Sequence, residues 1–258
     1  MRPWVSVPRF LAGLAAAFLL SAPASALTLS DLSLTITSGA TVTLSNLAAN
    51  GTVTTDAAGN VEVVDNGTAY LPAGPTSNWD VQSWDLQANA DPAVAAILGI
   101  ANLSASTRTF TITFTANVGA QGPSTLTSGR VSNALGAIPL LTGTISSVSG
   151  TPVYTALIDN SPVHTLLNDP FSATNTTFND QFGGPGTVLF GLVPAPTVPG
   201  PAVSNTIGIQ LTFNLAPLSA VAIGAAFVVE PVPEPTTIVL LAFGLGGLAL
   251  AGSSRRRA

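Results

Sequence analysis

The sequence predicts an all-β protein, built as an antiparallel β-sandwich of jelly-roll-like type. The first observation is strict alternation of apolar and polar residues over residues 107–118, 206–215 and 220–229. A period of two is typical of strands that bury one face. The second observation is turn chemistry between short segments, such as Asn50-Gly51, Asn66-Gly67 and Gly183-Gly184-Pro185. Strands with one apolar face must bury it, which favours two packed sheets.

Further segments have weaker strand patterns. They are residues 27–37, 41–47, 61–64, 79–87, 94–103, 138–146, 153–158 and 187–192. Residues 92–100 are ambiguous, because their alanine and leucine content also permits a helical turn. The proline-rich stretch 194–201 resembles a domain linker, but only one hairpin follows it, and a lone hairpin is marginally stable. We therefore interpret it as a long loop and expect a single exported domain over residues 27–230.

The N-terminus has the pattern of a secretory signal peptide over residues 1–26. Arg2 and Arg9 precede an apolar stretch at 10–20, and Ala24 and Ala26 form an A-x-A cleavage site. A permanent anchor is the weaker alternative, because about 11 apolar residues are too few to span a bilayer. The pattern predicts signal peptidase and the secretion machinery as partners and an exported chain that begins at Leu27.

The C-terminus, residues 231–258, has three parts in a fixed order. Pro233-Glu234-Pro235 comes first, an uncharged apolar run follows at 238–252, and Arg255, Arg256 and Arg257 come after it. As a helix the run would be about 22 Å long, which is short of the ~30 Å hydrocarbon core. The arginines favour a membrane helix over a buried core helix, because the positive-inside bias holds them in the cytoplasm. We expect a transient hold in the membrane.

This tail resembles the PEP-CTERM sorting signal of Gram-negative bacteria. The resemblance rests on Val-Pro-Glu-Pro at 232–235, the short apolar segment and the three arginines, and it covers about a tenth of the chain. It implies recognition and processing by exosortase, an integral-membrane cysteine peptidase. It also implies a precursor in the inner membrane and a product at the cell surface or outside the cell, typically in organisms that make exopolysaccharide.

Removing both ends leaves an acidic body. Residues 27–232 contain 11 acidic residues and two cations, Arg108 and Arg130, with no lysine, which is a net charge of −9. A surface that binds phosphates needs clustered cations, so nucleic acid is excluded as a partner and anionic membranes are disfavoured. The chain has no cysteine, which excludes thiol catalysis and cysteine-bound metals.

The acidic residues and the single histidine form no catalytic or metal motif. Asp80, Asp85 and Asp91 are close in sequence to two tryptophans. Asp159, Asp169 and Asp180 surround His164. Aspartates at such places commonly cap turns, and no G-x-S-x-G elbow or EF-hand loop occurs. We expect no enzyme activity and no cofactor, with calcium binding as a remaining alternative. A hydrolase would need two carboxylates in one pocket.

Trp79 and Trp84 raise the possibility of sugar binding. They are five residues apart, so a continuous strand would place them on opposite faces, one buried and one exposed. An exposed indole is a stacking platform for a sugar ring. The alternative is that a bulge turns both tryptophans inward.

The sequence therefore favours a non-enzymatic protein of the cell surface or extracellular matrix, associated with the envelope or with the exopolysaccharide of a biofilm. A carbohydrate-binding or adhesive module that uses Trp79 or Trp84 is the alternative. Alternating threonines at 109–115 are interpreted as the solvated face of one strand, since threonine is a good strand former.

Overall fold

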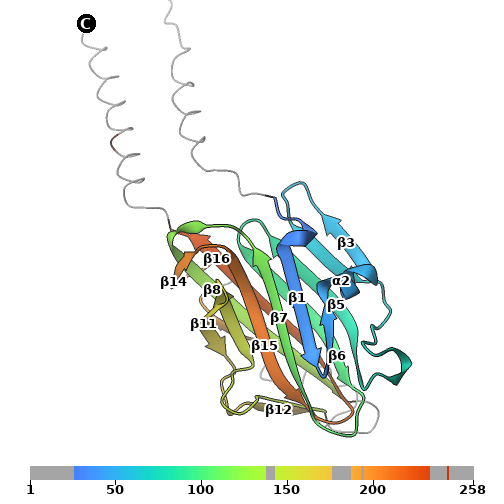
Figure 1. Cartoon of the computed structure of the whole chain (residues 1–258). Coiled ribbons are helices and arrows are strands. Elements are labelled where there is room, and N and C mark those ends of the chain that lie inside the picture. The colour runs from blue at the N-terminus through green and yellow to red at the C-terminus, as the bar shows by residue number, and fades with distance from the viewer. Residues whose placement is uncertain (1–25, 138–142, 176–186, 193–194, 233–242, 244–258) are drawn as a thin grey trace, which may run out of the picture.

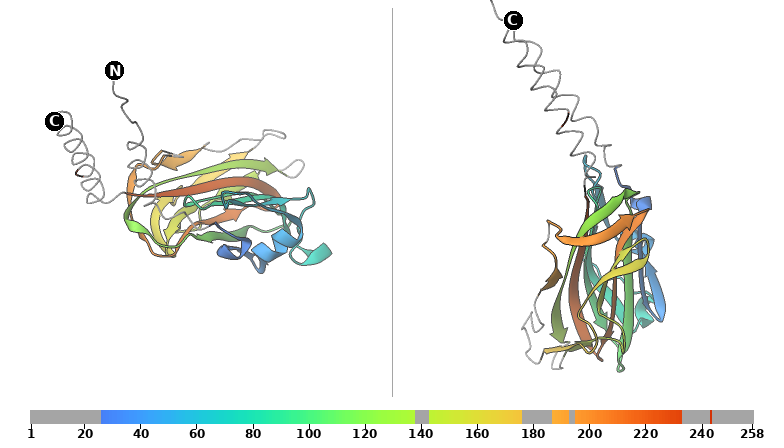
Figure 2. Two further views of the ribbon diagram at one scale, coloured as in Figure 1. Left: turned by 90° about the horizontal axis from the view of Figure 1, so that it is seen from above. Right: turned by 90° about the vertical axis from the view of Figure 1, so that its left-hand side faces the viewer.

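The protein is a sandwich of two antiparallel β-sheets that pack face to face (Figures 1 and 2). The computed structural model describes residues 26–137, 143–175, 187–192, 195–232 and Phe243. The predicted all-β class and the two packed sheets are confirmed. The N-terminal residues with Ala24, and the tail segments that contain Pro233, Glu234, Pro235 and Arg255–Arg257, lie outside the described residues.

The first sheet, called sheet A, has a main path of six strands. In spatial order these are β11 (Ser161–Leu166), β10 (Tyr154–Ile158), β15 (Thr206–Leu215), β7 (Arg108–Asn117), β1 (Leu32–Ser38) and β2 (Ala40–Thr43). Two further strands, β9 (Gly143–Ser146) and β12 (Ser172–Asn175), pair with each other, and β9 also pairs with the end of β15.

The second sheet, called sheet B, has a main path of seven strands. In spatial order these are β13 (Val188–Phe190), β8 (Gln121–Ala137), β16 (Ser219–Pro231), β6 (Ala93–Asn102), β5 (Trp79–Asn89), β4 (Val61–Asp65) and β3 (Gly51–Thr55). One more strand, β14 (Val198–Val203), pairs with β8. Since β3, β4, β5 and β6 are consecutive neighbours, this half of sheet B is a meander and not part of the jelly roll that we expected.

The strands with the clearest alternation occupy the middle of both sheets. The inward residues of β7 and β15 include Phe110, Phe114 and Phe213, which are all fully buried. The ring of Phe110 lies 5.6 Å from that of Phe213 and 5.4 Å from that of Trp79, which belongs to the opposite sheet. Aromatic packing between the sheets therefore forms the centre of the core.

Three segments differ from the sequence prediction because of local or tertiary effects. Residues 44–47, the end of the strand expected over 41–47, instead belong to the short helix α2 (Leu44–Ala49). It begins at Thr43, whose N–H and hydroxyl both donate to Asn46 Oδ1 at 2.8 Å. The other two short helices are η1 (Leu29–Asp31) and η2 (Gly74–Thr76). The ambiguous stretch 92–100 is strand from Ala93 onward, because β6 pairs with β5 on one side and β16 on the other.

The third difference concerns β8 and its partner β14. We did not predict β8, a strand of 17 residues, because it contains Gly, Pro and Ser and its inward positions include the threonines Thr125 and Thr127. The proline-rich stretch interpreted as a loop contributes the beginning of β14, which pairs with β8. Thr125 Oγ1 donates to Pro201 O and Thr127 Oγ1 donates to Val198 O. Tertiary hydrogen bonds thus stabilise strands that local pattern does not favour.

The folded structure continues up to the tail. Strand β16 pairs with β8 as far as Pro231, and the N–H of Val232 donates to Ser124 O at 3.0 Å. Among the described residues, no helix has the length and apolar character needed to cross a membrane. The helix predicted over 238–252 lies outside that part of the chain, except for Phe243.

Candidate functional site

Both tryptophans proposed as a sugar platform are buried. Trp79 is 2% exposed and Trp84 is 1% exposed. A bulge between Val81 and Ser83 inserts one extra residue into β5, so both indoles point to the inner face of the sheet. The expectation that one of them is exposed is therefore wrong, and the bulge alternative is correct. The indole nitrogen of Trp84 has no hydrogen-bond partner among the described residues.

The three aspartates near the tryptophans have separate environments. Asp80 is 8% exposed, and burial raises the pKa of its carboxyl group. Asp85 lies on the outer face of sheet B, and Asp91 is exposed in the turn after β5. Within the described ranges, no group of three His, Cys, Asp or Glu side chains is placed to hold a metal ion.

The aspartates near His164 stabilise loops. Asp159 accepts hydrogen bonds from the N–H groups of Ser204, Asn205 and Thr206 at 2.8 to 3.0 Å, and these bonds, with that from Thr206 the strongest, lower its pKa. The hydroxyl of Ser147 donates to Asp169, which lowers the pKa of that carboxyl group. Asp180 lies outside the described residues.

His164 lies between the two sheets at one edge of the sandwich. Its Nε2 atom is 3.2 Å from Thr127 Oγ1, and its ring lies 4.4 Å from that of Phe190. Partial burial lowers its pKa. No described carboxylate hydrogen-bonds this imidazole, so the arrangement is not that of a catalytic triad.

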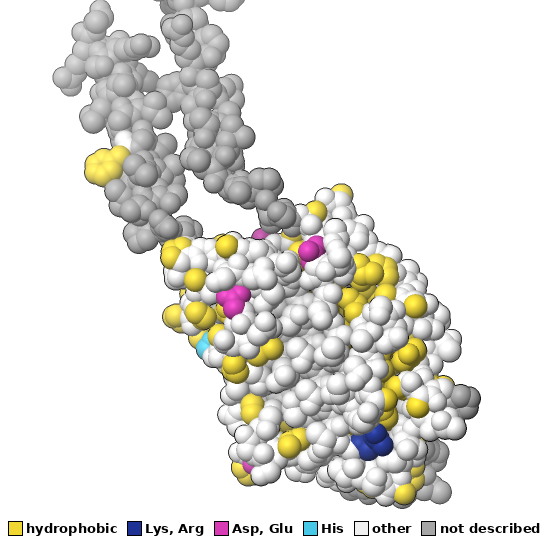
Figure 3. Space-filling model, viewed as in Figure 1, with side chains coloured by type: hydrophobic (Ala, Val, Ile, Leu, Met, Phe, Trp, Pro, Cys, Tyr) yellow, Lys and Arg dark blue, Asp and Glu magenta, His cyan; other side chains and the backbone are white. Residues whose placement is uncertain are grey.

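The outer face of sheet A is rich in hydroxyl groups from neighbouring strands. The register places outward threonines of four strands beside one another: Thr41, Thr43, Thr35, Thr37, Thr111, Thr113 and Thr212. Figure 3 shows this face as a broad area with few charged or apolar side chains. The predicted solvated threonine face of residues 109–115 is therefore part of a larger polar surface.

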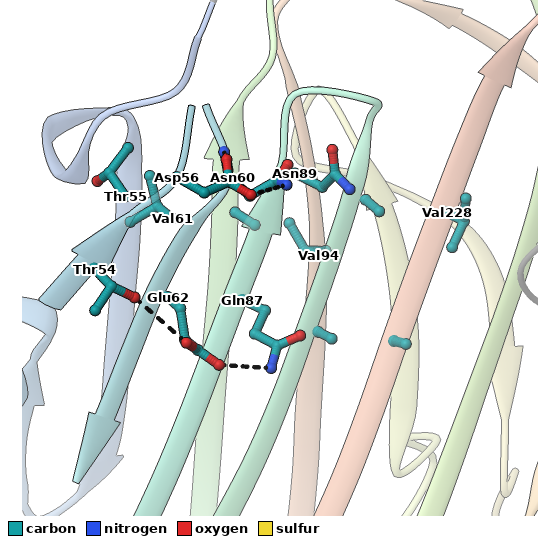
Figure 4. A pocket seen from close by; sticks show the side chains of 14 residues that line it. Thr54, Thr55, Asp56, Asn60, Val61, Glu62, Gln87, Asn89, Val94 and Val228 are labelled. Carbon is teal, nitrogen blue, oxygen red and sulfur yellow. Dashed lines mark hydrogen bonds between the residues drawn. The ribbon is translucent and has the colours of Figure 1, made fainter. Parts of the chain in front are cut away.

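The outer face of sheet B contains two adjoining hollows, of about 410 and 390 Å³. Both are lined by Gln87 of β5 and Ala95 of β6. The floor is low where outward positions of β6 and β16 hold small residues, namely Ala93, Ala95, Gly224 and Ala226, and the larger Ile97 and Val228 of the same strands also line the hollows. Longer polar side chains from β4 and β5 form one wall (Figure 4), and Arg130 of β8 lines the second hollow from the other side. We call the two hollows together the sheet B trough.

The wall of the trough is a hydrogen-bonded row of polar side chains. Gln87 Nε2 donates to Glu62 Oε1 at 3.1 Å and to Asp85 Oδ1 at 3.1 Å, and Thr54 Oγ1 donates to Glu62 Oε2 at 3.3 Å. Since both carboxylates are bonded to one nitrogen, they lie within roughly 6 Å of each other. The row therefore presents carboxylate oxygens that can accept hydrogen bonds from a ligand.

Sequence reasoning named Asp85, and it named Gln87 as a side chain that can hydrogen-bond sugar hydroxyls, but it gave no binding role to Glu62 or Arg130. Each of them is the outward residue of a strand, so alternation gives its face once the strand is known. What brings them together is strand order, since β4, β5, β6, β16 and β8 are adjacent in sheet B but far apart in the chain.

Comparison with known families gives one match. The model of the PEP-CTERM protein-sorting motif matches residues 231–257, which include the Pro-Glu-Pro element and the three arginines. No curated protein matches the chain. The predicted resemblance is confirmed for the tail. Residues 231–257 are a PEP-CTERM sorting motif, which implies an exported protein that is targeted to exosortase.

Proposed function

We propose that this chain is a non-enzymatic protein of the cell surface or extracellular matrix, associated with the envelope or exopolysaccharide after exosortase processing. The sorting motif at 231–257 carries the proposal, because it begins at the last residue of β16 and therefore follows the sandwich directly. The exported part is then the whole sandwich. Its acidic, lysine-free composition suits a matrix of uncharged hydroxyl-rich polymer better than one of anionic lipid or nucleic acid.

The processing step is tested by replacing Pro233-Glu234-Pro235 with three alanines in the producing organism. We expect a precursor that stays in the membrane fraction and is heavier than the normal product by the mass of the tail. Intact-mass spectrometry of membrane and external fractions measures both properties. Glu230→Ala is the matched control, because it removes an exposed carboxylate just before the motif. Unchanged mass and unchanged external yield in the triple variant would contradict the processing proposal.

Association with the matrix is tested independently of processing. Cells are compared with and without their extracellular polysaccharide, removed by mutation of its synthesis. We expect the processed protein to shift from the cell-associated matrix to the medium when the polysaccharide is absent. A processed protein that is distributed identically in both strains would exclude the association, while leaving the sorting step intact.

A further inference from the structure

The sheet B trough has the features of a binding site that the sorting motif does not explain. One row of residues runs straight across the sheet: Thr54, Glu62, Gln87, Ala95, Ala226 and Arg130 are successive strand partners. Its two central members are alanines, so the polar side chains stand on either side of a low floor. Three strand spacings put the backbones of Gln87 and Arg130 about 14 Å apart. This width suits a ligand that lies flat across the sheet.

Arg130 is an exposed cation at one side of the trough. The other arginine of the exported body, Arg108, donates from Nε to Ser38 Oγ at 3.2 Å and from Nη2 to the carbonyl oxygen of Ser38. Arg130 is exposed and has no hydrogen-bond or ion-pair partner within the described part of the chain. Its guanidinium group offers five N–H donors to a ligand above the floor.

The opposite wall supplies acceptors. The oxygens of Glu62 and Asp85 are held in place by Gln87, whose own carbonyl oxygen is bonded to no described atom. Hydroxyl groups both donate and accept hydrogen bonds, so a polyol matches a site with donors on one side and acceptors on the other. Ionised acceptors form hydrogen bonds about twice as strong as neutral ones, which favours hydroxyl donors at this wall.

Charge decides between a neutral and an anionic ligand. An anionic polymer would gain one contact with Arg130 but would face Glu62, Asp85 and the net charge of −9 of the exported body. At physiological salt the screening length is about 8 Å, so the carboxylates of the wall are close enough to repel it. An uncharged chain avoids this cost.

We propose that the sheet B trough binds a short stretch of neutral polysaccharide. Sugar hydroxyl groups donate hydrogen bonds to the carboxylates of Glu62 and Asp85, and sugar oxygens accept hydrogen bonds from the guanidinium group of Arg130. This inference rests on the proposed association with exopolysaccharide and names the surface that makes it. The shallow floor, without an exposed aromatic ring, predicts weak binding by each trough, which many copies along one polymer would strengthen.

The test measures binding of the full chain, purified in a detergent without a sugar head group. The probes are neutral oligosaccharides of β-glucan, dextran and galactan, with oligogalacturonate as the anionic comparison, followed by titration calorimetry or ligand-observed NMR. Ala95→Leu fills the floor of both hollows and should weaken binding of the neutral probe more than tenfold. Arg130→Gln should weaken it about tenfold, which corresponds to the loss of a hydrogen bond from a charged group.

Two matched controls locate the site. Thr113→Leu adds the same side chain to the outer face of sheet A, and Arg108→Gln removes the same charge at the beginning of β7 in sheet A, so both should leave binding unchanged. Binding should also change less than about twofold between low and high salt, because no net charge is neutralised. The proposal is wrong if no neutral probe binds, if oligogalacturonate binds better, or if Ala95→Leu binds as the parent does. Normal processing of the tail with any of these results would reject the trough and leave the sorting proposal standing.

Discussion

At the scale of single residues, burial of polar groups makes the stability of the protein depend on pH. The clearest example is His164, the single histidine of the chain. Its position against Phe190 and Thr127 removes part of its hydration shell, and this lowers its pKa in the folded protein. Its contribution to the free energy of unfolding should therefore depend on pH. The direction follows from whether the folded or the unfolded chain binds more protons.

Because His164 is harder to protonate when folded, the unfolded chain binds more protons between the folded pKa and about 6.5. The free energy of unfolding should fall as pH falls from about 7 into this window. The side chain is partly exposed, so we expect a loss below about 1 kcal/mol. Denaturant unfolding of the parent and of His164→Gln at pH 7.5 and 5.5 measures it. Since this is the only histidine of the chain, and the buried Asp80 is present in both proteins, the variant should lose the fall in stability that His164 contributes over this range. An equal slope in both proteins would refute the assignment.

At the scale of elements, the decisive feature is the bulge in β5. Val81 pairs with Ile100 and Ser83 with Gly99, so Gln82 is the extra residue of the strand. Side chains alternate with a period of two, and one inserted residue therefore reverses the face of everything beyond it. This single residue turns both tryptophans into the core. It also sets which side chains of β5 reach the trough.

Deleting Gln82 should be tolerated, because Trp79 and Trp84 then become four residues apart and share the inner face of a regular strand. We expect a loss of no more than about 1–2 kcal/mol. Deleting Asp85 is the matched control. Trp84 and Leu86 then become consecutive residues on opposite faces, so the strand can keep Trp79 and Leu86 in the core only by turning Trp84 outward. That deletion should cost several kcal/mol. Tryptophan emission and denaturant midpoints of the two deletions distinguish these outcomes. Similar damage from both would argue against this account of the bulge.

At the scale of the whole molecule, polar side chains fasten the two sheets together. Tyr154 of sheet A donates its hydroxyl to the carbonyl of Ala226 in sheet B at 2.9 Å. Asn102, at the end of β6 in sheet B, donates from Nδ2 to Leu215 O at 3.0 Å and Ala216 O at 2.9 Å, at the end of β15 in sheet A. Both side chains are fully buried. Hydrophobic interactions in the core are non-directional, so these directional hydrogen bonds help to fix how the two sheets are placed on each other.

Asn102→Leu should lower the free energy of unfolding by about 2–4 kcal/mol, because two carbonyl groups lose a buried donor. For a domain of this size, that corresponds to a fall in Tm of roughly 4–16 °C. Thermal unfolding followed by circular dichroism measures it. The same substitution at the exposed Asn168 provides the control and should shift Tm little. A parent-like Tm for Asn102→Leu would show that this connection between the sheets contributes nothing.

The sequence by itself determined the class of the fold, the three strongest strands and the sorting tail, because these depend on local signals. Alternation over 206–215 marks β15 residue for residue, and the motif at 231–257 is contiguous in the chain. It did not determine β8, β14 or the trough. The residues of β8 have only a weak local preference for strand conformation, and hydrogen bonds from β16, β13 and β14 stabilise the strand.

Only the tertiary structure decided what the outward residues do. Glu62, Gln87 and Arg130 are unremarkable in sequence, and the order of strands in sheet B makes them two walls of one trough. The bulge at Gln82 likewise buries both tryptophans, where a continuous strand was expected to leave one of them exposed. The physical reason is common to both cases. Pairing between distant strands sets register and neighbours, and those interactions are absent from any local pattern of residues.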